Sequence, residues 1–267
     1  MPPLGAHGSE LRDLANHLVS NGCVKSMPAS RRVRVIYNNT VIVDSTKGIF
    51  VWEHPWYPHY YFPVTEIKNA TLGDAEIIEG TGNGSHLAAL STLTVAARED
   101  EGIKHASTDR VLRFVDDAKL GPLAGLVRLE FGSMDQWLEE DIPIYVHPKD
   151  PFKRVDILPS SREIEVRVDG QTVAKSSFAM HLFETGLPTR YYLPLGSVNV
   201  SVLRRSDLTT KCPYKGEAEY YHIFVGGKTH ENLVWYYRNP IQESIGIAGL
   251  VCFYNEKVEI LVDGEKI

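Results

Sequence analysis

The feature that most constrains this chain is an internal repeat with a spacing of 131 residues. Residues 33–43 and 164–174 are both alternating apolar stretches around a central dipeptide, Asn38-Asn39 in the first and Asp169-Gly170 in the second. Such dipeptides between alternating stretches are typical of a two-residue β-hairpin. The sequence therefore predicts the same hairpin twice.

Further blocks match in the same order along the chain. At the spacing of 131 residues, Trp52-Glu53 aligns with Phe183-Glu184, and Tyr60–Pro63 aligns with Tyr191–Pro194. At a spacing of 124 residues, Ala124–Val127 aligns with Ala248–Val251. This order indicates an internal duplication of a β-rich unit of about 110–130 residues.

The strand pattern predicts a mainly β fold. Short strands are expected at 197–204, 219–225, 229–238 and 249–262, with Gly226-Gly227 as a further hairpin turn. Many short strands with closely spaced turn signals are typical of an all-β sandwich or barrel-like unit. Prolines near residue 150 indicate a linker, so the expected domains are 1–31, 32–155 and 156–267.

One amphipathic helix is expected before the first repeat, following a loose segment at residues 1–8. Ser9 can cap its start and Asn21-Gly22 can end it. Its apolar face consists of Leu11, Leu14, Ala15, Leu18 and Val19. Two other segments are interpreted from composition alone: the acidic run 139–141 as a solvated helix end, and Gly80–Gly84 as a flexible loop.

Composition and charge exclude several classes of protein. With 43% hydrophobic residues, 23% charged residues and a net charge of −6, the chain has the composition of a globular protein and lacks the basic character of nucleic-acid binders. No run approaches the ~18 apolar residues of a membrane-spanning helix. Three cysteines without a C-x-x-C pair favour a reducing compartment over disulfides or a zinc site. We therefore expect a cytoplasmic protein with no nucleic-acid or membrane partner, and oligomerisation is left open.

The segment Cys212-Pro213-Tyr214-Lys215-Gly216 carries the most reactive side chains in the chain. Cys212 can be a nucleophile beside a cation, or a packed small apolar residue. Lys215 can anchor an anionic group, or be solvated. Replacing Lys215 by Ala is expected to cost no more than about 0.5 kcal/mol, as for a lysine with an exposed end.

Glu184 has an apparent counterpart in Glu53, and both follow a large aromatic residue. A carboxylate in that setting is either a buried structural ion pair or an acid/base group with a raised pKa. For Glu184 the candidate partners are Arg190, Lys215 and Tyr192.

Polar aromatic residues are unusually frequent in the second half of the chain. Buried phenols need hydrogen-bond partners, so several of these rings are expected to line a cavity. The cavity is expected to be walled by Tyr192, Tyr214, Trp235 and Tyr254. In the first half, His54 and His59 could bind a metal, but no further ligand lies at fitting spacing, so no metal or other cofactor is predicted.

These motifs together resemble a widespread family of domains of unknown function, number four hundred and twenty-seven in that series. The family carries a nucleotidyltransferase-like label. The resemblance covers about residues 32–265 in a tandem two-domain form and depends most on Cys212–Gly216. It implies two tandem β-tent-like domains, each with two antiparallel sheets over an aromatic-lined pocket. The zinc of many β-tent proteins is not implied, because the C-x-x-C pairs are missing.

Two functions are expected from these features. The first is a cofactor-independent enzyme of the isomerase, cyclase or lyase type acting on a small organic molecule, and the second is a non-catalytic small-molecule-binding module. Nucleotidyl transfer is not favoured, because no paired carboxylates stand beside a phosphate-binding loop. The first repeat lacks the Cys212–Gly216 motif and is expected to be degenerate.

The residues assigned to catalysis are Glu184, Lys215, Tyr192 and Cys212. The residues assigned to substrate binding are Tyr191, Tyr214, Trp235, Tyr237 and Tyr254.

Overall fold

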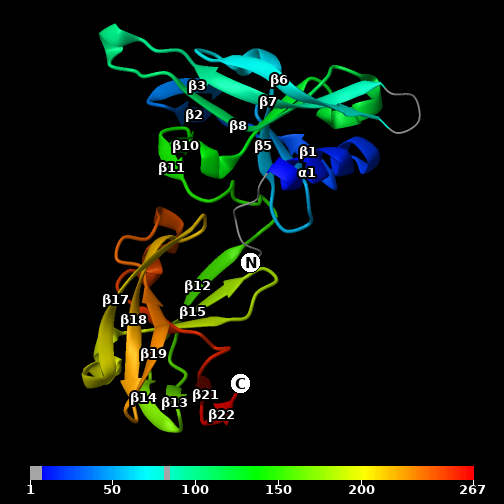
Figure 1. The fold of residues 1–267 in the computed structure, drawn as a ribbon. Helices are drawn as coiled ribbons and strands as arrows, with labels where there is room; N and C mark the ends of the chain where they lie inside the picture. The colour runs from blue at the N-terminus through cyan, green and yellow to red at the C-terminus, as the bar shows by residue number, and fades with distance from the viewer. Residues whose placement is uncertain (1–7, 81–84) are drawn as a thin grey trace. The chain divides into compact units, whose positions relative to one another are not determined.

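The structure is a computed structural model that describes residues 8–80 and 85–267 (Figure 1). The expected loose N-terminus and most of the expected loop Gly80–Gly84 lie outside the described residues. The chain divides into two compact units, Met1–Pro148 and Lys149–Ile267. The repeat boundaries drawn from the sequence stay a prediction, and each unit is described by itself.

The first unit is built from one α-helix, short 3-10 segments and strands. The helical segments are α1 (Gly8–Asn21), η1 (Val64–Glu66), η2 (Glu99–Glu101), η3 (Ala118–Leu123) and η4 (Phe131–Ser133). The strands are β1 (Lys25–Pro28), β2 (Val33–Tyr37), β3 (Thr40–Ser45), β4 (Ile49–Trp52), β5 (His59–Pro63), β6 (Thr71–Glu79), β7 (His86–Val95), β8 (Ala106–Phe114), β9 (Leu126–Leu129), β10 (Gln136–Glu139) and β11 (Ile142–Ile144).

The second unit has the same kinds of element except the α-helix. Its strands are β12 (Val155–Ser160), β13 (Ile164–Val168), β14 (Gln171–Ser176), β15 (Ala179–Glu184), β16 (Arg190–Leu193), β17 (Leu203–Cys212), β18 (Gly216–Val225), β19 (Lys228–Tyr236), β20 (Val251–Phe253), β21 (Glu259–Val262) and β22 (Glu265–Lys266). Its 3-10 segments are η5 (Leu195–Ser197), η6 (Val200–Val202) and η7 (Gln242–Ile247).

The two units have the same sheet topology, and the expected mainly β fold is confirmed. A seven-stranded sheet runs β1-β4-β5-β9-β8-β7-β6 in the first unit and β12-β15-β16-β20-β19-β18-β17 in the second. A four-stranded sheet runs β11-β10-β2-β3 in the first and β14-β13-β21-β22 in the second, which is the same order read from the other edge. The main core of each unit is formed by apolar residues from both of its sheets.

Strand register makes the two units comparable residue by residue. On the first seven-stranded sheet, Tyr61 and Leu112 are the two neighbours of Arg128 across β5, β9 and β8. On the second, Tyr192 and Trp235 are the two neighbours of Cys252 across β16, β20 and β19. Arg128 and Cys252 are therefore structurally equivalent positions.

The turn residues form both predicted hairpins. Asn38 and Asn39 have φ of 49° and 54°, and Asp169 and Gly170 have φ of 48° and 75°. A two-residue turn with both φ values positive is the tight hairpin connection that Asn, Asp and Gly favour. The hairpins β2–β3 and β13–β14 lie in separate sheets, as the duplication requires (Figure 1).

The predicted helix is confirmed and covers the outer face of the first seven-stranded sheet. Leu11, Ala15 and Leu18 are buried in one cluster with residues of β7 and β8. Gly22, with φ of 72°, donates its N–H to the carbonyl of Leu18 and ends the helix. Residues 149–267 are all described and contain no α-helix, and Ile247 of the 3-10 segment η7 is buried against the outer face of the second seven-stranded sheet.

Two local predictions are wrong. The acidic run belongs to the hairpin β10–β11, not to a helix end, because Glu139 accepts hydrogen bonds from Tyr60 (2.8 Å) and Arg31. The strand expected at 197–204 is instead the pair of 3-10 turns η5 and η6, and the strand β17 starts at Leu203. Strand β17 is almost entirely polar and exposed, so it carries no apolar alternation.

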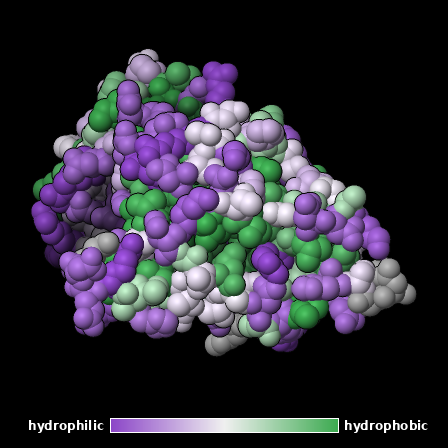
Figure 2. Space-filling model, turned by 90° about the horizontal axis from the view of Figure 1, so that it is seen from above, coloured by the Kyte–Doolittle hydropathy of each residue, from purple (hydrophilic) through white to green (hydrophobic). Residues whose placement is uncertain are grey.

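The surface is mixed in character. Figure 2 shows hydrophilic residues over much of the visible face, with apolar side chains emerging between them. In the part of the chain that the structure describes, every helix is too short or too polar to cross a bilayer.

Candidate functional site

The motif Cys212–Gly216 forms the tight turn between β17 and β18, where Cys212 pairs with Gly216. Gly216 has φ of 99°, a backbone conformation that favours glycine, and a Cβ there would lie 3.4 Å from the backbone nitrogen of Ile241, at ordinary contact distance. The hydroxyl of Tyr214 accepts the N–H of Asp150 (2.8 Å), and Ser244 donates its hydroxyl to the carbonyl of Tyr214 (2.8 Å). These bonds hold the turn in one arrangement.

Lys215 and Glu184 form a buried ion pair, with 2.5 Å between Nζ and Oε2. A second cation, Lys153, lies 3.2 Å from the other carboxylate oxygen. Burial alone would raise the pKa of Glu184, but the two ammonium groups outweigh it and the pKa lies below its ordinary value. Glu184 is therefore an ionised carboxylate, and the solvated interpretation of Lys215 is wrong because its side chain is only 9% exposed.

The thiol of Cys212 lies beside this ion pair. Its Sγ is 3.9 Å from Nζ of Lys215, and the residue is half-buried. Two lysines surround one carboxylate, so the group beside the sulfur carries a net positive charge. A cation at this position can stabilise a thiolate, the nucleophilic form of cysteine.

Several of the predicted aromatic residues pack together on the outer face of the second seven-stranded sheet. Buried in this cluster are Leu182, Tyr192, Ala218, Tyr220, Trp235, Tyr237, Ile247 and Cys252. The half-buried ring of Tyr254 lies against Trp235, with 4.5 Å between ring centroids. We call this set the aromatic face.

Tyr192 is the most deeply buried of these aromatic side chains. Its hydroxyl accepts a hydrogen bond from Nε1 of Trp235 (3.1 Å), and burial raises its pKa well above the ordinary value. These contacts fix the ring of Tyr192 in the packing of the aromatic face.

Tyr191 does not lie with the other predicted binding residues. Adjacent residues of a strand point to opposite faces of the sheet, so Tyr191 packs against the core between the sheets while Tyr192 lies on the outer face. Its ring contacts His181 edge-on, with 4.8 Å between centroids. Tyr214 is also apart from the cluster of buried rings, in the turn, where Lys153 lies over its ring at 5.5 Å.

Register equivalence shows how the outer faces of the two units differ. Leu90 pairs with Leu112 beneath α1, and Tyr220 pairs with Trp235 at the same place in the second unit. Two residues further along each strand, Phe114 is replaced by Tyr237, since Ala88 pairs with Phe114 and Tyr237 directly follows the pair Glu219–Tyr236. In the unit without the α-helix, two leucines and a phenylalanine have thus become aromatic side chains with polar atoms.

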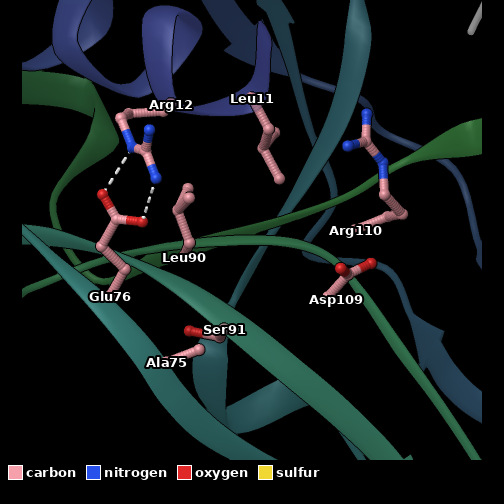
Figure 3. Close-up of a pocket in the computed structure, with 8 residues that line it drawn as sticks. All are labelled: Leu11, Arg12, Ala75, Glu76, Leu90, Ser91, Asp109 and Arg110. Atoms are coloured by element: carbon pink, nitrogen blue, oxygen red, sulfur yellow. Dashed lines mark hydrogen bonds and ion pairs between the residues drawn. The ribbon is translucent and has the colours of Figure 1, made fainter. Parts of the chain in front are cut away.

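A cavity of about 220 Å³ lies in the first unit, between α1 and β6, β7 and β8 (Figure 3). Arg12 and Glu76 close one side of it through two hydrogen bonds of 2.6 Å. It is lined by Leu11, Arg12, Ala75, Glu76, Leu90, Ser91, Asp109 and Arg110. None of the sequence-predicted site residues contributes to this cavity.

The first unit also contains a buried polar cluster around Glu53 that the sequence interpretation missed. Arg128 donates Nε to Oε1 of Glu53 (2.6 Å), Tyr61 donates its hydroxyl to the same oxygen (2.9 Å), and Nε2 of His59 lies 3.5 Å from Oε2. Aligning the blocks Ala124–Val127 and Ala248–Val251 one residue further would have placed Arg128 opposite Cys252. In the described ranges, no three His, Cys, Asp or Glu side chains are grouped closely enough to hold a metal ion.

Comparison with known proteins places the chain among proteins without an assigned activity. A family profile described as a domain of unknown function, DUF427, with a nucleotidyltransferase-like short name, matches residues 25–79 and 156–264. No curated protein matches the chain. The matched segments cover more than half of the sequence and include both units, so the chain belongs to the DUF427 family.

Proposed function

We propose that the chain is an enzyme that binds a small or medium organic molecule at the aromatic face of the second unit and transforms it there. The observation that carries this proposal is the exchange of side chains between equivalent sheet faces. Beneath α1 the first unit presents Leu90, Leu112 and Phe114, whereas the second unit, which has no α-helix, presents Tyr220, Trp235 and Tyr237 at these positions.

Aromatic rings with hydroxyl or indole groups are suited to ligand binding. They supply a large apolar surface together with a few polar atoms that fix orientation. A purely structural replacement for a lost helix would need no such polar atoms. The exchange therefore favours a ligand in the place that the helix occupies in the first unit.

The chemistry is proposed to reside at the neighbouring turn. Glu184 is ionised and can accept a proton from a substrate. Once it is protonated, Lys215 and Lys153 lose their counter-charge and can stabilise an anion that develops on the substrate. Cys212 stands within 3.9 Å of the same ammonium and can add to an electrophilic carbon. Isomerisation, cyclisation and lyase reactions all fit this combination.

A non-catalytic binding module is the second candidate. It is favoured by the saturation of the charged groups, since Glu184 already has two cations and the Tyr192 hydroxyl already has a donor. Such an arrangement can serve only to hold the turn and the rings in place. The free state of all three cysteines fits the proposed cytoplasmic setting of either function.

Conversion of the second face to the residues of the first tests the proposal. The variants Tyr220→Leu and Trp235→Leu introduce the side chains that the first unit has at these positions. Phe224→Leu, at an exposed residue of the same strand β18, is the matched control. Metabolites retained by the native protein would be identified by mass spectrometry after incubation with a cell extract.

We expect the wild-type protein and Phe224→Leu to retain the same compound and the two face variants to lose it. Retention by all four proteins would refute the assignment of the site. Recovery of a chemically altered compound identifies an enzyme, and recovery of the unaltered compound identifies a binding module.

A further inference from the structure

The polar cluster of the first unit contains an unsatisfied cationic donor. Arg128 is 9% exposed, and its Nε and Nη2 both face the carboxylate of Glu53, at 2.6 and 3.4 Å. Its third nitrogen, Nη1, is buried and has no hydrogen-bond partner among the described residues. Leaving a buried charged donor without an acceptor is costly, so the unpartnered nitrogen of Arg128 needs an explanation.

Several other groups that can donate a hydrogen bond or stack on a ligand lie beside this arginine. His59 contacts Glu53, and the ring of His54 lies 5.8 Å from that of His59. Tyr57 lies edge-on to His54 at 4.4 Å and stacks on His147 at 3.9 Å. Within this cluster, two side chains are buried, Arg128 and His147, and three are half-buried, His54, Tyr57 and His59.

We propose that Arg128, His59 and His54 form an oxyanion-binding site in the first unit, separate from the aromatic face of the second. The oxyanion is a carboxylate or a phosphate group of a small molecule, whose oxygen accepts the hydrogen bond of Nη1. Glu53 cancels the charge of Arg128 in the empty site, and the imidazoles supply further donors when the anion binds. Tyr57 forms the aromatic side of the site.

This assignment is specific to the first unit. The position of Arg128 is taken by Cys252 in the second unit, and that of His59 by Arg190, whose guanidinium is paired with Glu256 at 2.9 and 2.7 Å. The first unit therefore carries a different set of polar groups at these positions.

The test uses the full chain and two probes, acetate and inorganic phosphate, at constant ionic strength maintained with chloride. Binding is followed through the imidazole NMR signals of His54 and His59, assigned with the variants His54→Gln and His59→Gln. We expect saturable shifts of both signals with at least one probe. Acetate alone identifies a carboxylate site, phosphate alone identifies a phosphate site, and binding of both identifies a general oxyanion site.

Arg128→Lys keeps a cation for Glu53 and removes the unpartnered nitrogen, so it should weaken binding about tenfold or more. Arg110→Lys is the matched control, because Arg110 pairs with Glu130 in the same unit. If Arg128→Lys is poorly folded, His54→Gln replaces it, with the His59 signal as readout and the same expected direction. Absence of saturable shifts with both probes, or equal affinity of Arg128→Lys and the wild type, would overturn the proposal.

Discussion

Glu53 and Glu184 occupy equivalent positions at the end of equivalent strands, Glu53 just after β4 and Glu184 as the last residue of β15, yet each is neutralised by a cation from a different element. Glu53 is paired with Arg128 from β9, and Glu184 with Lys215 from the turn that precedes β18. Both units thus have the carboxylate at this position, but the cation that pairs with it comes from a different strand or turn in each unit. Each ion pair can therefore be tested separately, by substitutions within its own unit.

Replacing Lys215 by Ala should destabilise the second unit by about 3 kcal/mol, because breaking a buried ion pair leaves an uncompensated charge. Because Lys153 remains near Glu184, the loss in free energy of unfolding should lie at the lower end of the range for broken buried ion pairs. Equilibrium denaturation in urea measures the change. The double variant Glu184→Gln/Lys215→Met should recover most of the loss, and strict additivity of the two single changes would contradict a direct pair.

Alkylation of Cys212 should depend on Lys215. Iodoacetamide attacks thiolates, and Nζ of Lys215 is the cation 3.9 Å from the sulfur. We expect Lys215→Met to slow the alkylation of Cys212 several-fold at neutral pH, measured by peptide mass spectrometry.

Cys23 provides an internal control for this experiment, because it is half-buried and lies in the other unit. Its alkylation rate should be the same in both proteins. Equal slowing at Cys23 and Cys212, or no slowing at Cys212, would remove Lys215 as the activating group.

Stability of the first unit should fall as the pH is lowered from 6.5. Burial lowers the pKa of His59 to about 4, against the opposing charge of Glu53. Because its pKa is lower in the folded state, His59 is protonated first in the unfolded chain as the pH falls. The contribution of neutral His59 to the free energy of unfolding is therefore complete above pH 6.5 and is lost between pH 6.5 and 4. For Glu53, burial is outweighed by Arg128 and the pKa lies at about 2, so its contribution is complete above pH 4.5 and is lost below that.

Thermal unfolding across this range separates the two groups. His59→Gln should flatten the dependence between pH 6.5 and 4 by up to about 1.4 kcal/mol per pH unit, the value for one proton. The slope below pH 4 should remain. An unchanged slope between pH 6.5 and 4 would show that His59 is not held neutral by burial.

Removing the carboxylate of Glu184 should impair the proposed activity, whereas removing that of Glu53 should not. Glu184→Gln should reduce turnover or retention of the compound identified at the aromatic face, whereas Glu53→Gln should leave both unchanged. Both variants need the same check of folding by circular dichroism, since each carboxylate is buried in an ion pair. Loss of function in Glu53→Gln alone would move the site to the first unit.

Local signals in the sequence were sufficient for much of the fold. The hairpins followed from Asn38-Asn39 and Asp169-Gly170, because a positive φ is a property of the turn residues themselves. Helix α1 followed from its apolar spacing and Gly22. Strand β17 could not be predicted from its own residues, because a polar, exposed strand is recognised only through its pairing with β18.

The site was predictable in position but not in contacts. Cys212, Tyr214 and Lys215 are neighbours in sequence, so their shared turn was foreseeable. The burial of Lys215 depends on Glu184, 31 residues away, and the role of Arg128 depends on Glu53, 75 residues away. Side-chain pairs of that separation are set by strand register, which the residue pattern does not specify on its own.

Over residues 8–80 and 85–267, every sheet takes all of its strands from one unit, and no strand is exchanged across residue 148. In evolutionary terms, the two halves have remained separable since the duplication. A single recombination event before Val155 would cut no hydrogen-bonded ladder, so either half can be lost, doubled again or fused to a new neighbour while its sheets stay whole.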